Sequence, residues 1–237
     1  MRMFGPFPAA RRRGREGVAA VEFALVGPIL VLLLIGTMVN YLDRTVMSIA
    51  APKIRAEWGL TPAEYGWIAS SFAWAYALAQ LPGGYVLDRL GTKLTYFLSV
   101  TVWSLFTVAQ GFAGGFRSLI GCRIGLGGAE APCFPANSRV LASWFPQDER
   151  ARANAIYSVG MYAGIGFLTV PLNWVMDKWG WHAMIIGVGS LGVVFGALWL
   201  VIFREPQDSK TANQAELDYI KAGGGLGQVP TKVPFKW

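Results

Sequence analysis

The chain has 237 residues, of which 54% are hydrophobic and 15% charged, with a net charge of +7 and a mean hydropathy of +0.40. A soluble domain carries roughly 25% charged residues, so this composition excludes an ordinary water-soluble globule. A transmembrane helix needs about 20 apolar residues, so the length allows six spans with short loops and excludes twelve.

Long apolar runs follow a leader, residues 1–23, that is rich in Arg, Pro and Gly. Charged or Gly-rich turns separate these runs, which predicts an all-α, polytopic membrane protein with a six-helix transmembrane bundle over residues 24–203. The six spans are expected at about 24–49, 65–87, 94–113, 116–144, 153–176 and 183–203. Residues 204–237 are predicted to form a polar cytoplasmic tail.

Basic residues gather on one side of this predicted bundle. With six spans, the two tails, the loop between the second and third spans and the loop between the fourth and fifth share a side, and they hold 14 of the 21 basic residues. Cytoplasmic loops are enriched in Lys and Arg, so both termini are predicted to be cytoplasmic. Topology thus accounts for the net charge, and the absence of a continuous basic patch in the sequence argues against a nucleic-acid partner.

Four charged residues lie away from the ends of predicted spans, where charges are costly and often mark a transport pathway. Asp43 and Arg44 adjoin in the first span, while Arg123 and Glu130 lie nearly two turns apart in the fourth. The charges either neutralise each other or line a polar cavity. In a cavity, either arginine offers a fork for a carboxylate, and either acid exchanges a proton near neutral pH because it lies in low dielectric.

Polar aromatic residues accompany these charges. Tyr76 and Gln80 share one face of the second span, and Tyr41 lies close to Asp43 in the first. The side chains fit two roles equally well: hydrogen bonding to a polyhydroxylated ligand, and anchoring at the membrane interface.

Cysteine and histidine are too sparse to form a reactive site. Cys122 and Cys133 have no zinc-site spacing, and His182 is the single histidine. The sequence contains no nucleophilic triad or cofactor motif, so we expect no metal, no cofactor and no enzymatic activity.

The turn between the second and third spans carries a motif. Residues 84–93 follow the pattern G-x-x-x-D-R-x-G-x-R/K, which resembles the loop 2–3 signature of the major facilitator superfamily. The resemblance implies the amino-terminal half of that fold, with a conformational latch at this turn that breaks in one state. The latch residues are Gly84, Asp88, Arg89, Gly91 and Lys93. We expect Asp88 to lack its latching helix here, because that helix belongs to a second six-helix half.

Further motifs over residues 38–228 narrow the resemblance to the anion:cation symporters, nearest to the galactonate/glucarate branch. These motifs are Asn40–Arg44, Phe72–Tyr76, Glu130–Pro135, Ser143–Pro146, Glu149–Arg150 and Ala215–Ile220. The resemblance implies proton symport of a sugar-acid anion by alternating access, in a multi-pass protein of the bacterial inner (plasma) membrane.

The resemblance also implies roles for individual residues. The family's carboxylate-binding arginine falls on Arg44, and its proton-carrying acids fall on Asp43 and Glu130. Arg123 falls on the arginine that pairs with these acids. The implied substrate-binding set is Arg44, Tyr41, Tyr76 and Arg123. Galactonate-type members tend to have Gln where Met161 stands here, which leaves the exact sugar acid open.

Residues 10–36 carry a second resemblance. Arg11–Gly17, followed by the apolar run Val18–Val26 with Glu22 fifth after Gly17, is similar to the amino terminus of TadE-like pilus-assembly proteins. A prepilin-type peptidase would cut after Gly17. We interpret the segment as a fusion or a gene-model join, with a coincidental basic leader as the alternative.

Three hypotheses follow. The first is a transporter half whose partners are a sugar-acid anion, protons, the lipid bilayer and a second six-helix half from a homodimer or a separate chain. The second is a non-functional truncated transporter fragment, and the third is a membrane-anchored pilus-assembly component.

Overall fold

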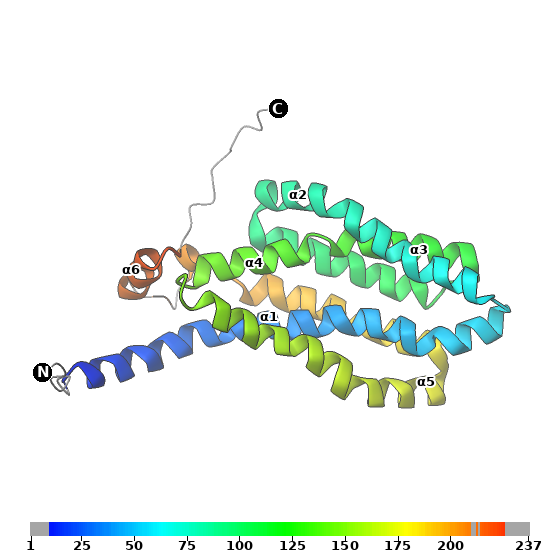
Figure 1. Cartoon of the computed structure of the whole chain (residues 1–237), viewed down its shortest axis with the longest axis horizontal. Coiled ribbons are helices and arrows are strands. Elements are labelled where there is room, and N and C mark those ends of the chain that lie inside the picture. Colours follow the sequence, from blue (N-terminus) through cyan, green and yellow to red (C-terminus); the bar gives the residue numbers. More distant parts are fainter. Residues whose placement is uncertain (1–9, 210–211, 213, 226–237) are drawn as a thin grey trace, which may run out of the picture.

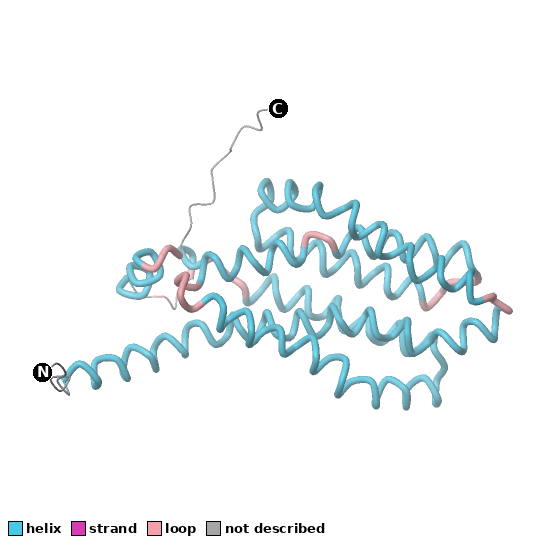
Figure 2. The backbone as a smooth tube through the Cα atoms, viewed as in Figure 1, coloured by secondary structure: helices cyan, strands magenta, loops and turns pink. Residues whose placement is uncertain are grey.

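A computed structural model describes the backbone of residues 10–209, 212 and 214–225, and side chains from residue 27 onward. Over these residues the fold is all-α, as predicted, with short loops and no strand (Figure 2). The helices are α1 (Ala10–Trp58), α2 (Pro62–Gln110), α3 (Phe116–Glu130), α4 (Cys133–Trp144), α5 (Arg150–Ile202), the 3-10 helix η1 (Pro206–Asp208) and α6 (Gln214–Ala222).

The predicted spans are distributed over these helices with different boundaries. The second and third predicted spans both lie in α2, and the fifth and sixth both lie in α5. Each long helix is broken at one glycine with positive φ, Gly91 (φ 76°, ψ 171°) in α2 and Gly180 (φ 83°, ψ 167°) in α5. The fourth predicted span is divided into α3 and α4 just before Cys133, where Pro132 has no amide hydrogen to continue the helix.

The first helix is longer than the predicted span 24–49. It begins at Ala10 and ends at Trp58. The helix ends there because Gly59 adopts φ 63° and the amide of Leu60 donates a hydrogen bond back to the carbonyl of Arg55 at 3.0 Å. From Ala10 onward the predicted leader is therefore helical and continuous with α1. Residues 1–9 and the side chains up to residue 26 lie outside the described part, so cleavage after Gly17 stays a prediction.

The tail contains structure that the sequence did not predict. The short helix α6 docks on the junction between α4 and α5, at the end of the bundle where Figure 1 also places the amino-terminal end of α1. Arg150 donates to the carbonyl of Gly224 at 2.7 Å, and the amide of Gln147 donates to the carbonyl of Gly223 at 2.9 Å. The hydroxyl of Tyr219 adds a bond to Glu149 at 2.9 Å.

The helices pack as two pairs that share a contact. α1 lies along α5 and α2 lies along α3, while contacts between α2 and α5 join the pairs (Figure 1). Glycines allow the close approach of α1 and α5, because a Cβ on Gly164 would lie only 3.0 Å from the carbonyl oxygen of Met38. Few backbone contacts connect α1 directly to α2. Between α1 and α2, the two helix pairs are therefore joined by side chains.

The apolar core forms two clusters along the bundle. One includes Leu33, Trp103 and Trp199, and the other includes Ile54 and Ile185. Each cluster takes residues from α1, α2, α3 and α5. Along α1 the first cluster ends at Val39 and the second begins at Leu42, so the charged residues of the first span lie where the two clusters meet.

Two of the described helical stretches, Gly27–Trp58 in α1 and all of α5, are long and apolar enough to cross a membrane by length and composition alone. The sequence predicted six spans. α3 is only 15 residues long, and α2 buries polar side chains such as Thr92, Ser99 and Thr107, which lower its apolar content.

We expect Gly180→Ala to lower the thermal unfolding midpoint of the detergent-purified protein by about 3–10 °C, because the φ/ψ of Gly180 strains any residue with a Cβ by roughly 1–3 kcal/mol. The surrounding space is open, so the effect comes from the backbone alone. Gly187→Ala is the matched control, since Gly187 also faces open space in α5 but has no positive φ. Equal midpoints for the two variants would contradict a glycine-dependent break.

Candidate functional site

An ion pair between Arg44 of α1 and Glu130, the last residue of α3, forms the centre of the site. Nε of Arg44 donates to Oε1 of Glu130 at 3.0 Å, and Nη2 donates to the same oxygen. Glu130 is completely buried, whereas 30% of the Arg44 side chain remains exposed. The pair links α1 to α3, which belong to different helix pairs, and it leaves guanidinium surface available to another anion.

Three aromatic rings surround the Arg44 guanidinium. Its central carbon lies 5.2 Å from the ring centroid of Tyr41 and 5.1 Å from those of Phe72 and Tyr76. The faces of aromatic rings are negative, so they stabilise a cation that has lost part of its water. The structure therefore brings both predicted tyrosines to Arg44. Phe72 was missed, although it lies four residues before Tyr76 and hence on the same helix face.

Arg123 is buried in α3 and contacts an aromatic ring. Its guanidinium carbon lies 4.7 Å from the ring centroid of Phe72, while Nε and Nη1 have no hydrogen-bond partner among the described residues. In this structure Glu130 is hydrogen-bonded to Arg44, so the prediction that Arg123 pairs with the acids stays a prediction.

The side chains of Asp43 and Arg44 contact different groups, although the two residues are neighbours in sequence. Its carboxyl is buried beside Thr107 and Trp103 of α2, and neither oxygen has a hydrogen-bond partner among the described residues. The interpretation in which Asp43 and Arg44 neutralise each other is therefore wrong. Asn40, one turn earlier in α1, is also buried with both amide atoms unpartnered among those residues.

The predicted latch has a partner within the described bundle. Nη1 of Arg139, in α4, donates to Oδ1 of Asp88 at 3.1 Å and to the carbonyl of Leu87 at 3.1 Å. Asp88 thus has a partner on α4 of the same bundle, while the expectation that its latching helix belongs to a second half stays a prediction. The carboxylate remains 77% exposed, so the pair is of the weak, solvent-screened kind.

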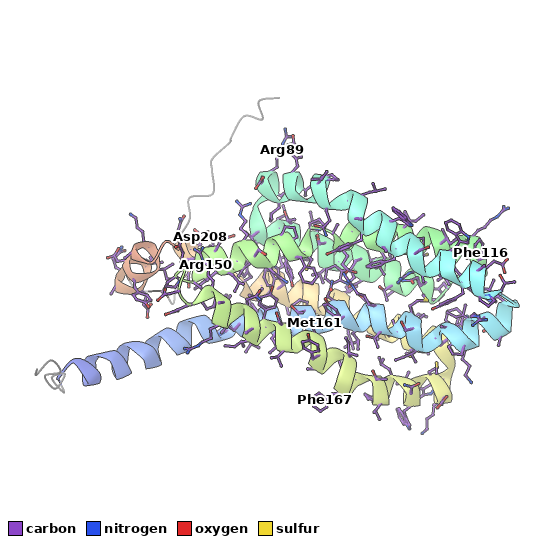
Figure 3. The ribbon with its side chains drawn as sticks, viewed as in Figure 1. Arg89, Phe116, Arg150, Met161, Phe167 and Asp208 are labelled. Atoms are coloured by element: carbon purple, nitrogen blue, oxygen red, sulfur yellow. The ribbon has the colours of Figure 1, made fainter. Side chains whose placement is uncertain are left out.

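The other latch residues are spread around this turn. Gly91 forms the break in α2, and Gly84 lies in helix with open space around it. Arg89 stacks over Tyr85 at 4.5 Å and projects away from the bundle (Figure 3). Lys93 uses its carbonyl to accept a bond from the indole of Trp199 at 3.2 Å, and burial lowers the pKa of its amine.

The described residues contain no group of three His, Cys, Asp or Glu side chains that could hold a metal. Cys122 and Cys133 are free thiols. Met161 is half-buried on α5, about midway along the bundle (Figure 3), and presents a thioether to its surroundings.

Comparison with known proteins gives a consistent result. Residues 33–236 match the Major Facilitator Superfamily. A D-galactonate transporter of Escherichia coli O6:H1 is 43% identical over 205 residues, which cover 86% of this chain and 48% of that protein. The probable galactarate/D-glucarate transporter GudP of Escherichia coli K12 is 40% identical over 222 residues, which cover 88% of this chain and 49% of the relative. The chain spans about half the length of the curated relatives it matches.

Solved structures show the same fold. An inward-facing, unoccupied bacterial homologue of the human lysosomal transporter Spinster has a TM-score of 0.65 at 26% identity, covering 75% of this chain and 43% of that one. The proton:xylose symporter XylE has a TM-score of 0.68 at 13% identity, covering 86% of this chain and 50% of the other. The second likeness concerns the fold alone. The predicted six-helix half of a facilitator fold is thereby confirmed.

Proposed function

Since this chain belongs to the Major Facilitator Superfamily, we propose that it forms the amino-terminal half of a secondary transporter that carries a sugar-acid anion together with protons. The observation that carries the proposal is the partly exposed Arg44 guanidinium, held by three aromatic rings and bonded to the buried Glu130. A guanidinium fork matches a carboxylate, so a substrate carboxylate can compete for the position of Glu130.

The substrate class follows from the chemistry around Arg44. Arg44 supplies the carboxylate-binding group, and the hydroxyls of Tyr41 and Tyr76 supply hydrogen bonds for a polyhydroxylated chain. The names of the relatives, for D-galactonate and for galactarate or D-glucarate, support the same class. Met161 offers no hydrogen bond comparable to a glutamine, so the proposal names a class of sugar acids and not one member.

Proton coupling is proposed to use Glu130 and Asp43. When a substrate carboxylate takes Arg44, Glu130 loses its charge partner in a buried setting, where an ionised carboxyl is costly. Uptake of a proton removes that cost, so substrate and proton binding favour each other. Asp43 is equally buried and unpartnered, and we assign it a second proton position. Arg123 supplies positive charge near both acids.

The second wall of the pathway is proposed to come from another six-helix half, provided by a second copy, a separate chain or further sequence. In this superfamily's architecture the substrate lies between repeated halves that rock about a midplane site. The Asp88–Arg139 pair lies within this half and leaves the Asp88 carboxylate 77% exposed, so this carboxylate remains available for a contact with a helix of the second half.

The chain is an integral membrane protein by its family. We propose a bacterial inner-membrane location with both termini cytoplasmic. The basic residues favour this orientation, and α6 and the amino-terminal end of α1 lie at the same end of the bundle (Figure 1). We further propose transport without enzymatic catalysis.

Uptake into proteoliposomes tests the proposal. We expect radiolabelled D-galactonate or D-glucarate to bind the purified chain, and to accumulate when a proton gradient is directed into vesicles that hold a complete pathway. Vesicles without protein and vesicles with a collapsed gradient are the controls. Binding without accumulation by the chain alone supports the half-transporter, whereas neither binding nor accumulation contradicts the proposal and favours a non-functional fragment.

The pilus-assembly alternative makes a separate prediction. Intact-mass measurement of the protein purified from a bacterial host would show loss of the first 17 residues if a prepilin-type peptidase acts after Gly17. An intact amino terminus would contradict that role.

A further inference from the structure

We propose that Phe72 is a positioning residue: its ring holds both Arg44 and Arg123 and thereby prevents Arg123 from capturing Glu130. This inference rests on the proposed transport function and concerns the way in which substrate binding is linked to the proton. Phe72 would act through the two arginines and not by touching the substrate's reacting groups.

One buried ring contacts two cations in this site. The Phe72 side chain lies 5.1 Å from the guanidinium carbon of Arg44 and 4.7 Å from that of Arg123, measured to the ring centroid. Phe72 is 8% exposed, so water screens these contacts only weakly. The two cations come from α1 and α3, and the ring comes from α2.

The backbone around Phe72 is fixed against α3. A Cβ on Gly127 would lie 3.1 Å from the backbone nitrogen of Tyr76, so α2 and α3 already approach as closely as glycine allows. Phe72 also stacks on Tyr76, with centroids 5.8 Å apart and planes inclined by 26°. The backbone that carries the ring is therefore held against α3, which keeps the ring close to Arg123.

The two arginines depend on this ring to different degrees. Arg44 has Glu130 and two tyrosine rings in addition to Phe72. Among the described residues Arg123 has Phe72 as its one ring-face contact, with Tyr65 as a further neighbour, and its Nε and Nη1 lack hydrogen-bond partners there. Loss of the ring would therefore release Arg123 more than Arg44.

A released Arg123 has an anionic acceptor available. Oε2 of Glu130 is buried and has no hydrogen-bond partner in the described structure, since both bonds from Arg44 go to Oε1. A guanidinium that reached Oε2 would keep Glu130 ionised and paired at every stage. The substrate carboxylate would then take Arg44 without any need for Glu130 to accept a proton, and binding would lose its link to pH.

The experiment measures D-galactonate affinity of the full chain between pH 6 and pH 8. In the unchanged protein we expect affinity to rise as pH falls, by up to about tenfold per pH unit for one linked proton. Phe72→Leu should flatten this dependence to less than about twofold between pH 6 and pH 8, and this change in slope, not the affinity at any single pH, is the test. Phe72→Tyr retains a ring and should restore the dependence.

Phe195→Leu is the matched control, since Phe195 is a buried phenylalanine of α5 that contacts no cation among the described residues. It should keep the pH dependence of the unchanged protein even if it lowers stability. A wild-type pH dependence in Phe72→Leu would overturn the inference, as would equal flattening in Phe195→Leu.

A double-mutant cycle separates this inference from the proposed function. If the unchanged chain binds no sugar acid, the proposed function fails, and the thermal midpoints of Phe72→Leu, Arg123→Gln and the double variant then decide the role of Phe72. Non-additivity of about 2–4 °C supports a direct contact between the ring and the cation. Additive effects overturn the inference, and the cycle of Phe195→Leu with Arg123→Gln should be additive.

Discussion

Arg44→Ala is expected to weaken D-galactonate binding by at least about 100-fold, because hydrogen bonds to a charged partner in a desolvated site contribute roughly 2–5 kcal/mol. Arg44 is the arginine of the site whose side chain remains partly exposed, at 30%, while Arg123 is 5% exposed. Equilibrium binding of the radiolabelled anion to the purified protein measures the loss.

Two further variants sharpen the interpretation of Arg44→Ala. Arg44→Lys keeps the charge but not the planar fork, so it should recover only part of the affinity. Arg117→Ala removes an exposed arginine at the start of α3, away from the ion pair, and should bind like the unchanged protein. Retained affinity in Arg44→Ala would refute the carboxylate-binding role.

Glu130→Gln is expected to abolish proton-driven accumulation while leaving substrate exchange within about threefold of the unchanged protein. Glutamine has nearly the shape of glutamate but carries no exchangeable charge, so Arg44 is permanently free for the substrate carboxylate and no proton is taken up with it. Counterflow and pH-gradient uptake, measured in the same proteoliposomes containing a complete pathway, separate the two activities.

Glu57→Gln serves as the control for Glu130→Gln. Glu57 accepts a hydrogen bond from the indole of Trp181 at 2.7 Å, near the end of α1 that is distant from α6. Glu57→Gln should therefore leave proton coupling unchanged. If Glu130→Gln accumulates substrate as the unchanged protein does, Glu130 does not carry the coupled proton. An equal loss of exchange and accumulation would instead indicate a damaged site.

Much of the fold was predictable, because apolar runs in the sequence indicate helices and the charged segments between them indicate turns. The details of helix connection were not. A single positive-φ glycine joins two spans at Gly91 and again at Gly180, where short turns over residues 88–93 and 177–182 were expected. The break before α4 had a signal in Pro132, but a proline can also be accommodated within a helix, as Pro28 is in α1.

The candidate residues were predictable, but several of their partners were not. Asp43 and Arg44 are neighbours in sequence, yet a helix turns successive side chains by about 100°, so they meet different groups. The partner of Arg44 lies 86 residues away in Glu130. Which arginine reaches an acid depends on how α1 and α3 are rotated about their axes, and packing against other helices sets that rotation. Phe72 begins the Phe72–Tyr76 motif, but its role was overlooked because an apolar residue in an apolar span does not indicate a contact with a cation.

The docked tail helix has a practical consequence. α6 is tied through Arg150 and Gln147 to the start of α5 and the loop before it, so its backbone moves with that end of the bundle. A fluorophore or spin label on an exposed position of α6, such as Lys221, would therefore report the position of that end of the bundle. Distances from that label to a label on a second half would record the tilt between the two halves during the proposed transport cycle, without a label near Arg44.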